Sequence, residues 1–337
     1  MNKSQWCIRF CVALTTVAVF FLMVPAFVGA ADKIILKHAH QNLSPTDTHT
    51  QTAKKFADLV NERSSGRIEI KLYPGTLADG PELLSVAQQG VADTMSVVTN
   101  FISARVRALA PIEWVGAYPA EDKFLEVAEG IRPVMTKIFD KEGLTYLSSQ
   151  YSFADFFWVN RNKNLVAVSD FKGEKLRVPG LWINKQTTAL GATPVMILPP
   201  ELYPSLQRGV IDGLGTIASL VVGFKLYEPA PFVARMPDAS ASLVIFCANT
   251  EKFSRLSAED QALIRKAAID AETWSYDYGR KLEDDMRTFL RANTKYVDMS
   301  PEQRKAVLDA RGSLKEDLLE YSGPLGRELM TVFDGLR

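Results

Sequence analysis

From residue 33 onward, apolar positions follow two patterns, one typical of strands and the other of helices. The run KIILKHAH (33–40) predicts a buried strand, and RIEIKLYPG (67–75) alternates as a strand that a turn closes. Between them, residues 44–66 have helical spacing, with Ser44 as the expected N-cap and Gly66 just beyond the end. Because strand and helix alternate from the start, the sequence predicts an α/β fold.

One helix-strand segment occurs twice. PELLSVAQQGVAD (81–93) and PELYPSLQRGVID (200–212) are identical at seven of thirteen positions, at a constant offset of 119 residues. In each copy a proline opens the predicted helix, a glycine ends it, and a strand follows. The copies also share polar residues that helix capping does not require, namely Gln88 with Gln207 and Asp93 with Asp212. The repeat therefore predicts two lobes of similar plan.

The segments that follow the two repeats are candidates for a shared ligand cleft. In open α/β sheets, ligands bind beyond the carboxyl ends of the strands. These ends correspond to SVVTNF (96–101) in the first copy and GLGTIA (213–218) in the second. A cleft between the two lobes would be lined by both segments.

A long amphipathic segment follows these repeats. It begins with a capping box at Ser257 and Asp260 and keeps its helical pattern to about Asn293. A helix of this length extends for roughly 54 Å, which is more than one small lobe needs, so we expect it to span both lobes. Prolines 301 and 324 are expected to start two closing helices. The predicted division is a signal peptide (1–30), lobe I (31–152 plus 241–280) and lobe II (153–240 plus 281–337).

The first thirty residues have the pattern of a secretory signal peptide. The first ten residues contain Lys3 and Arg9 and no acidic residue, and an apolar run then continues to about Phe27. Small residues follow and lead to a predicted cleavage site after Ala30. An uncleaved membrane anchor is the alternative, because the run is near the length that spans a bilayer. The small residues and the lack of a flanking positive charge favour cleavage, which predicts a periplasmic mature protein.

Composition narrows the choice of partners. Cys7 and Cys11 lie in the predicted signal peptide, so Cys247 alone remains and no intramolecular disulfide can form. Removing Lys3 and Arg9 leaves 37 basic against 39 acidic residues, a net charge of −2, without a basic run. Nucleic acid and anionic membranes are therefore not expected as partners.

Motifs for enzyme, cofactor or metal chemistry are weak. GLGTIA fits the dinucleotide fingerprint with alanine last, but it occurs late in the chain and lacks the acidic partner, so no cofactor is expected. His38 and His40 share a strand face and His49 follows, but no cysteine or carboxylate cluster joins them, so no metal site is predicted. His40 is instead expected to donate or accept a hydrogen bond in a binding pocket.

A secreted hydrolase is the enzyme alternative. Its candidate acids are Asp79, Asp93, Asp155 and Asp212. Asp93 and Asp212 occupy equivalent positions in the repeat, which favours a structural role over an acid/base pair. No catalytic residues are therefore assigned.

Arg177 is the strongest candidate for ligand binding. It ends a predicted strand in FKGEKLRVPG (171–180), just before Pro179 and Gly180. The planar guanidinium pairs with a carboxylate through two charge-assisted hydrogen bonds, which lysine cannot imitate. A surface ion pair with Glu174 is the alternative. The position at a predicted cleft edge favours a ligand carboxylate.

The segments KLRVPG, LGATPVMILPPELYPSLQRGVIDG, GRIEIKLYPG and LLSVAQQGVAD resemble the DctP-type substrate-binding proteins of TRAP (tripartite ATP-independent periplasmic) transporters. The resemblance covers essentially the whole mature chain. It implies a two-lobed periplasmic binding-protein fold that closes on an organic acid, holds its carboxylate with Arg177 and delivers it to the membrane permease subunits. A sensory receptor that feeds a membrane kinase would carry the same features.

The chain departs from the pattern of sialic-acid-binding members of that family. Those members carry a second arginine before the one that corresponds to Arg177. Spacing to an asparagine that they share with this chain, Asn160, shows that Asp155 stands at the position of that second arginine. They carry a glutamate and an arginine where this chain has Val98 and Phe101, and an asparagine where it has Thr216. These differences disfavour a polyhydroxylated, highly charged ligand.

Aromatic residues accompany Asp155 in the second lobe. A carboxylate in an otherwise apolar pocket needs a partner, and a ligand ammonium or indole N–H would serve, so Asp155 is expected to favour amino-bearing ligands. Phe156, Phe157, Trp158 and Trp182 offer rigid apolar contact, although strand alternation sends some of these rings into the core. We therefore expect a monocarboxylate with a bulky or aromatic side chain, with amino acids and indole acids among the candidates; a sugar acid or dicarboxylate is the alternative. The predicted binding residues are Arg177, Asp155, Phe157, Asn160, Thr216, Val98, Phe101, His40, Asp79 and Trp182.

Overall fold

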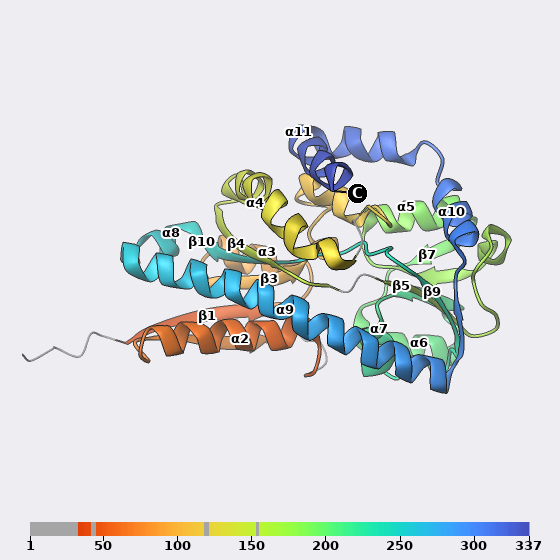
Figure 1. Ribbon diagram of the computed structural model, residues 1–337, viewed down its shortest axis with the longest axis horizontal. Coiled ribbons are helices and arrows are strands. Elements are labelled where there is room, and N and C mark those ends of the chain that lie inside the picture. The colour runs from red at the N-terminus through yellow and green to blue at the C-terminus, as the bar shows by residue number, and fades with distance from the viewer. Residues whose placement is uncertain (1–32, 42–44, 118–120, 153–154, 337) are drawn as a thin grey trace, which may run out of the picture. The chain divides into compact units, whose positions relative to one another are not determined.

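The strands form two separate sheets in the computed structural model, which describes residues 33–41, 45–117, 121–152 and 155–336 (Figure 1). The first sheet has the order β2-β1-β3-β10-β4 and the second has the order β11-β9-β5-β8-β6-β7. The strands of the first sheet are β1 (Ile34–His40), β2 (Ile68–Pro74), β3 (Thr94–Val98), β4 (Leu144–Gln150) and β10 (Val244–Asn249). Those of the second are β5 (Phe156–Asn160), β6 (Lys175–Arg177), β7 (Thr193–Val195), β8 (Gly213–Thr216), β9 (Phe232–Met236) and β11 (Lys295–Asp298). We call the two halves built on these sheets lobe I and lobe II.

Each sheet mixes parallel and antiparallel neighbours. In lobe I, β1 runs parallel to β2 and β3, while β10 is antiparallel to β3 and β4. In lobe II, β6 runs parallel to β7 and β8, while β5 is antiparallel to β8 and β9. Each sheet therefore contains one strand, β10 in lobe I and β5 in lobe II, that runs antiparallel to both of its neighbours.

Helices cover the sheets. The α-helices are α2 (Thr48–Arg63), α3 (Glu82–Gln88), α4 (Phe124–Asp140), α5 (Leu181–Ala189), α6 (Leu202–Arg208), α7 (Ala218–Gly223), α8 (Thr250–Ser254), α9 (Ala258–Asn293), α10 (Pro301–Asp309) and α11 (Leu314–Gly335). Short 3₁₀ helices are η1 (Thr99–Phe101), η2 (Arg107–Glu113), η3 (Glu121–Lys123), η4 (Val168–Phe171) and η5 (Pro199–Glu201). The N-cap expected at Ser44 lies outside the described residues, and Asp47 caps α2 by accepting a hydrogen bond from His49 N at 2.8 Å.

The sequence repeat corresponds to one helix-strand unit in each lobe. Asp93, before β3, donates its backbone N–H to Lys37 O at 2.9 Å and accepts from Lys37 N at 2.7 Å. Asp212, before β8, makes the same pair of bonds with Lys175, at 2.8 Å and 2.8 Å. The two aspartates therefore fix adjacent parallel strands, which confirms their structural role.

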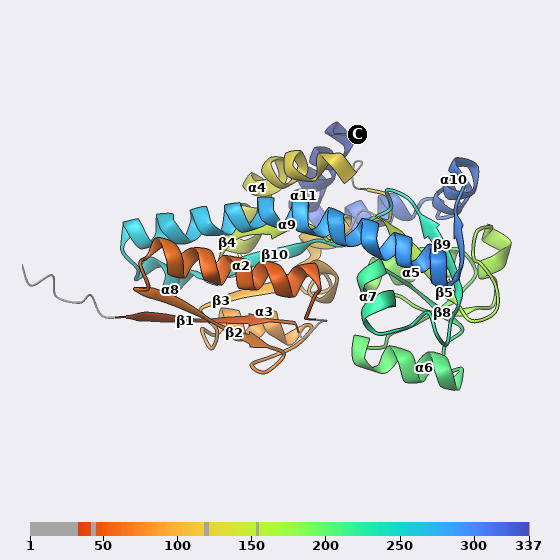
Figure 2. The same cartoon turned by 60° about the horizontal axis from the view of Figure 1, so that its bottom comes forward.

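The helix α9 passes along both lobes (Figures 1 and 2). Its N-cap is Ser257, whose side chain accepts from Asp260 N as the sequence predicts. In its first half Ala267 and Ala271 pack in the same core as Phe56 of lobe I. In its second half Met286 and Leu290 pack in a core of lobe II. The predicted two-lobed α/β fold with a long spanning helix is confirmed.

Side chains of α9 also hold the segment by which the chain first crosses between the lobes. Ser275 Oγ accepts from Tyr151 N at 3.0 Å, and Glu283 accepts from Tyr151 Oη at 2.8 Å and Asp155 N at 3.1 Å. Burial raises the pKa of Glu283 to about 8, the nearby charge of Asp155 adding to the effect. Ser275 and Glu283 thus supply acceptors for the backbone N–H groups of Tyr151 and Asp155, which lie beyond the end of β4.

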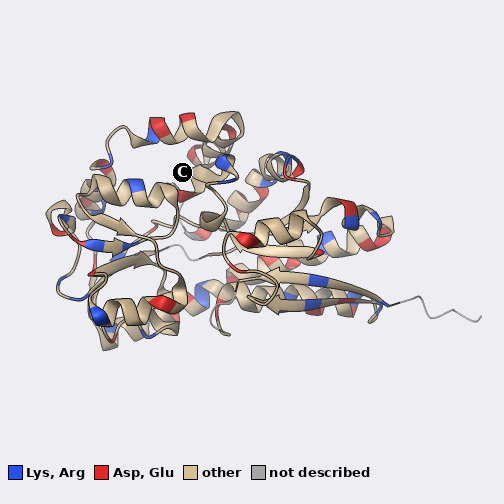
Figure 3. Cartoon of the chain, turned by 180° about the vertical axis from the view of Figure 1, so that it is seen from behind, with Lys and Arg blue, Asp and Glu red and all other residues tan. Residues whose placement is uncertain are grey.

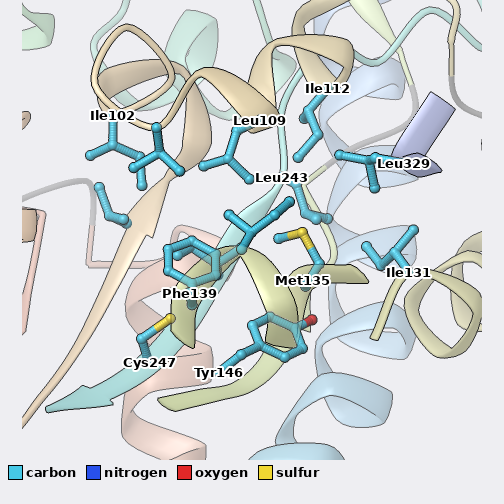
Figure 4. Close-up of a cluster of buried hydrophobic side chains, with 14 of the residues drawn as sticks. Ile102, Leu109, Ile112, Ile131, Met135, Phe139, Tyr146, Leu243, Cys247 and Leu329 are labelled. Atoms are coloured by element: carbon cyan, nitrogen blue, oxygen red, sulfur yellow. The ribbon is translucent and has the colours of Figure 1, made fainter. Parts of the chain in front are cut away.

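The last helix, α11, does not follow the expected assignment of residues 281–337 to lobe II. Its Leu329 shares a hydrophobic cluster with Leu109 of η2 and Ile131 and Met135 of α4, all in lobe I (Figure 4). Gly323, with φ 67° and ψ −168°, breaks the helix before Pro324. The second half of α11 therefore starts at Pro324, as the sequence predicts, and both halves of α11 bury apolar residues.

Candidate ligand-binding site

A cleft with an empty volume of about 590 Å³, including its open mouth, lies where the two lobes meet. Lobe I contributes residues at or just past the ends of β1 and β3, and lobe II contributes residues at or just past the ends of β6 and β8 together with residues of β5, α5, η5 and α7. The lining residues are Gln41, Val98, Asn100 and Phe101 from lobe I; Phe156, Arg177, Pro179, Ile183, Pro199, Thr216, Ile217 and Leu220 from lobe II; and Ser152, Ala241 and Ser242 from the crossing segments.

Arg177 is the one charged residue among the described residues that line this cleft. Its side chain is almost wholly buried at the end of β6, and Nε donates to Ile197 O at 2.9 Å. Its Nη1 has no hydrogen-bond partner, and no carboxylate of the described residues forms an ion pair with it. The alternative partner Glu174 instead pairs with Lys163 at 3.0 Å. Burial lowers the pKa of Arg177 to about 10, which leaves the guanidinium charged at neutral pH.

The other polar lining residues are uncharged and partly committed to the protein. Gln41 Oε1 accepts from Val98 N at 3.0 Å, and the hydroxyls of Ser152 and Ser242 lie 3.1 Å apart. These contacts connect residues around the cleft and leave few free polar atoms. The cleft is thus a mostly apolar chamber with a single cation.

Aromatic and aliphatic side chains form its walls. Phe101 and Val98 line it from lobe I, where the sequence comparison noted the absence of charge. Phe156 lines it from lobe II and packs edge-on against Trp158, with ring centroids 5.0 Å apart. Ile183 of α5 completes the pair of apolar walls.

The alternation of side chains along β5 places Phe156, and not the predicted Phe157, in the cleft lining. Phe157 was expected in the site, but it is fully buried in the core of lobe II with Val159. Its neighbour Phe156 faces the other side of the sheet and lines the cleft. Successive strand side chains point to opposite faces, so only one of the two phenylalanines can do so.

Asp155 does not line the cleft. Its carboxylate pairs with Arg235, with an Nη2–Oδ1 distance of 2.9 Å, and with Arg287 of α9 at 2.8 Å. It is fully buried directly before β5, where the crossing segment reaches lobe II. The carboxylate expected to meet a ligand ammonium is therefore occupied by two arginines of the protein.

Asn160 and Trp182 also lie away from the cleft lining. Asn160 is at the far end of β5, where Nδ2 donates to Glu174 Oε2 at 2.7 Å and Oδ1 accepts from Asn162 N at 2.8 Å. Trp182 is buried in α5 with its ring 5.5 Å from that of Tyr321. They stabilise a turn and an interlobe contact, respectively.

His40 and Asp79 lie close to one another but outside the cleft lining. His40 is buried, and its Nδ1 is 2.9 Å from Gln41 O. Burial lowers its pKa, and Asp79 raises it to a smaller extent. His38 and His49 both hydrogen-bond to Ser96 Oγ, at 3.0 and 2.7 Å. Within the described part of the chain, no set of three or more His, Cys, Asp or Glu residues is arranged to hold a metal ion.

Of the ten predicted binding residues, the structure brings together Arg177, Thr216, Val98 and Phe101 at the cleft. The sequence analysis missed Gln41, although it lies just past the carboxyl end of β1, where ligands bind in such sheets. It included Asn100 in the predicted lining segment 96–101 but did not single it out as a binding residue. Applying that rule to β1 as well as to the repeats would have found Gln41. Nothing local marks Ser152, Ala241 and Ser242, which reach the cleft only because the chain crosses there.

Comparison with known proteins identifies the architecture. The profile of the DctP family, described as bacterial extracellular solute-binding protein, family 7, matches residues 38–320. The chain belongs to this family. Among curated relatives, the ectoine-binding periplasmic protein TeaA of Halomonas elongata is 23% identical over 95% of this chain and 94% of its own. The 2,3-diketo-L-gulonate-binding periplasmic protein YiaO of Escherichia coli is 26% identical over 86% of this chain and 89% of its own.

Solved structures share the fold of this DctP protein. A TRAP periplasmic solute-binding protein from Ralstonia eutropha with bound (S)-2-acetolactate superposes with a TM-score of 0.80, at 24% identity, over 89% of this chain and 99% of that one. The expected DctP-type TRAP solute-binding protein, a periplasmic receptor rather than an enzyme, is thereby confirmed.

Charged residues of both signs are mixed along the described elements (Figure 3). Lys and Arg are interspersed with Asp and Glu over the face shown in Figure 3. None of the helices in the described ranges combines the length and apolarity needed to cross a membrane. The predicted signal peptide at residues 1–30 lies outside those ranges.

Proposed function

We propose that this protein is the extracytoplasmic receptor of a TRAP transporter for a monocarboxylate with a bulky apolar or aromatic side chain, which it delivers to the membrane permease subunits. The observation that carries this proposal is the buried guanidinium of Arg177, which has an unpaired Nη1 in an otherwise uncharged cleft. The family assignment supports the transport role, and the cleft supports the class of solute.

A carboxylate is the group that best satisfies Arg177. A buried cation without a partner is costly, since it has lost its hydration and gained no counter-charge. Nε is held by Ile197 O, so the guanidinium plane is fixed before ligand binds. A ligand carboxylate would receive charge-assisted hydrogen bonds from the remaining N–H groups.

The charge of the lining favours one carboxylate and no ammonium. A second carboxylate would find no other lysine, arginine or histidine among the described lining residues. An ammonium would find no aspartate or glutamate there, because Asp155 is paired with Arg235 and Arg287. Desolvating either charge without a partner opposes binding, so dicarboxylates and zwitterionic amino acids should bind weakly.

The walls favour an apolar body. Phe101 and Phe156 offer ring faces or edges from opposite lobes, and Ile183, Ile217 and Leu220 complete the surface. Burial of apolar ligand area contributes about 25 cal/mol per Å², so an aromatic side chain would add roughly 2 kcal/mol over a small acid such as pyruvate. A sugar acid would instead lose water from its hydroxyls against these walls. The relatives are named for ectoine and for 2,3-diketo-L-gulonate, so the choice of solute rests on this chain's own cleft.

The test is a ligand screen on the mature protein, residues 31–337. Native mass spectrometry of protein purified without added solute would first identify any retained acid. A thermal-shift panel would then compare phenylpyruvate, 3-phenyllactate and indole-3-acetate with phenylalanine, succinate, galacturonate and N-acetylneuraminate. We expect the largest shifts from the first three. Largest shifts from succinate or galacturonate would contradict the apolar monocarboxylate, and no shift from any acid would contradict carboxylate binding itself.

A further inference from the structure

In the part of the chain that the structure describes, the lobe I wall of the cleft carries one buried polar atom without a hydrogen-bond partner. Asn100, in the 3₁₀ turn after β3, is 5% exposed and lines the cleft between Val98 and Phe101. Its Oδ1 has no hydrogen-bond partner among the described residues. Buried side-chain oxygens usually have such a partner, so this one requires an explanation.

The orientation of the Asn100 amide follows from its other contact. Nδ2 donates to Ala241 O at 2.9 Å. A carbonyl oxygen can only accept, so the nitrogen must face Ala241 and the oxygen must be the atom left over. Ala241 itself lines the cleft, which locates the amide group at the cleft wall. The free atom of Asn100 is therefore an acceptor and not a donor.

The described contacts leave no neighbouring side chain to fill this role. The hydroxyls of Ser152 and Ser242 are within hydrogen-bond distance of each other, and Gln41 Oε1 accepts from Val98 N. Arg177 lies across the cleft in lobe II, with its Nε on Ile197 O. The cleft thus has one buried cation in lobe II and one buried neutral acceptor in lobe I.

We propose that Asn100 Oδ1 accepts a hydrogen bond from an uncharged donor on the solute, either a hydroxyl or a neutral N–H. This inference rests on the proposed function, in which Arg177 takes the carboxylate. The solute is then an apolar monocarboxylate with a hydroxyl or a neutral N–H at its other polar position. A charged ammonium fits less well, since an amide oxygen does not neutralise it and the lining holds no acid.

Matched ligands test this assignment. One pair is 3-phenyllactate and 3-phenylpropionate, which differ by a hydroxyl; the other is indole-3-acetate and its N-methyl derivative, which differ by an indole N–H. Titration calorimetry on the mature wild-type protein gives the affinity ratio within each pair. We expect at least one donor-bearing acid to bind about tenfold more tightly than its counterpart, because the donor-free acid leaves Oδ1 buried and unsatisfied.

Asn100→Leu should bring that ratio to about one, because it removes the acceptor while keeping an apolar side chain of similar size. Asn100→Ala provides the same comparison if the leucine variant does not fold. Val98→Ala is the matched control in the same wall; it should weaken both members of a pair and leave their ratio unchanged.

The outcomes separate the two proposals. If both members of each pair bind wild type equally, the role of Asn100 is wrong and the monocarboxylate proposal stands. If the preference persists in both Asn100 variants, the donor is bound elsewhere and the inference is also wrong. If no acid of either pair binds wild type, the proposed function itself fails.

Discussion

Glu113 of η2 accepts a hydrogen bond from the backbone N–H of Trp182 at 2.7 Å, which joins lobe I to the first turn of α5 in lobe II. The same carboxylate accepts from Ile183 N at 3.3 Å and from the hydroxyl of Ser103. The α5 N-terminus follows Arg177 by only a few residues. Glu113 therefore caps the helix that begins directly behind the proposed carboxylate anchor.

Glu113→Gln should remove a pH dependence of stability. Burial raises the pKa of Glu113 to about 7, so the folded protein holds a proton that the unfolded chain releases near pH 4.5. Glu113 therefore contributes stability that is present at acidic pH and falls as the pH rises from about 4.5 to about 7. We expect the free energy of unfolding of wild type minus that of Glu113→Gln to fall by on the order of 2 kcal/mol between pH 5 and pH 8.

Urea unfolding at the two pH values measures this difference. Glu129→Gln, at an exposed position on α4, is the matched control and should show no such change. Other buried acids, such as Glu283, are present in all three proteins and cancel in the comparison. A difference that is the same at both pH values would show that Glu113 does not titrate in this range.

Arg177→Met should act in opposite directions on binding and on stability. The ligand-free protein buries an unpaired cation, and an apolar side chain of similar length removes that cost. We expect the unliganded variant to be more stable by about 1 kcal/mol or more, although it loses the bond to Ile197 O. The same variant should show no carboxylate binding by calorimetry. A destabilised variant would indicate that the arginine is satisfied in the free protein.

Arg177→Lys isolates the geometry of the guanidinium from its charge. Lysine keeps the positive charge but cannot present two parallel N–H donors to a carboxylate. Its affinity for the best acid of the screen should fall by at least roughly 1.5 kcal/mol, the contribution of a hydrogen bond to a charged group. Equal affinities of wild type and variant by calorimetry would exclude Arg177 as the carboxylate contact.

Asp155→Asn should lower stability without changing ligand preference. The substitution leaves Arg235 and Arg287 without their shared carboxylate, and breaking a buried ion pair costs about 3 kcal/mol. Chemical denaturation should reveal this loss. The affinity ratio between an amino acid and its deaminated analogue should stay the same, in contrast to the expectation from sequence. A selective loss of affinity for the amino-bearing ligand would show that Asp155 does contribute to ligand binding.

Local patterns in the sequence were sufficient for the main architecture. The repeated helix-strand unit predicted the two lobes, because its prolines and glycines start and end each helix locally. The shared Asp93 and Asp212 bond instead to Lys37 and Lys175, which are 56 and 37 residues away in the chain. The capping box at Ser257 and the length of the following pattern predicted the helix α9. The position of Arg177 at a strand end before Pro179 and Gly180 predicted its place at the cleft.

The sequence by itself thus determined the α/β class, the two lobes, the spanning helix and the strand end that carries Arg177, since each can be inferred from a pattern or spacing of residues near in the chain. Only the tertiary structure decided which side chains line the cleft. Asp155 meets Arg235 and Arg287 from distant segments, and Phe156 rather than Phe157 reaches the cleft because the packing of helices on each sheet face sets which side is core. Likewise, Asn100 is an unsatisfied acceptor because its nitrogen meets Ala241 O, 141 residues away. Such partners are chosen by the fold, and no local spacing encodes them.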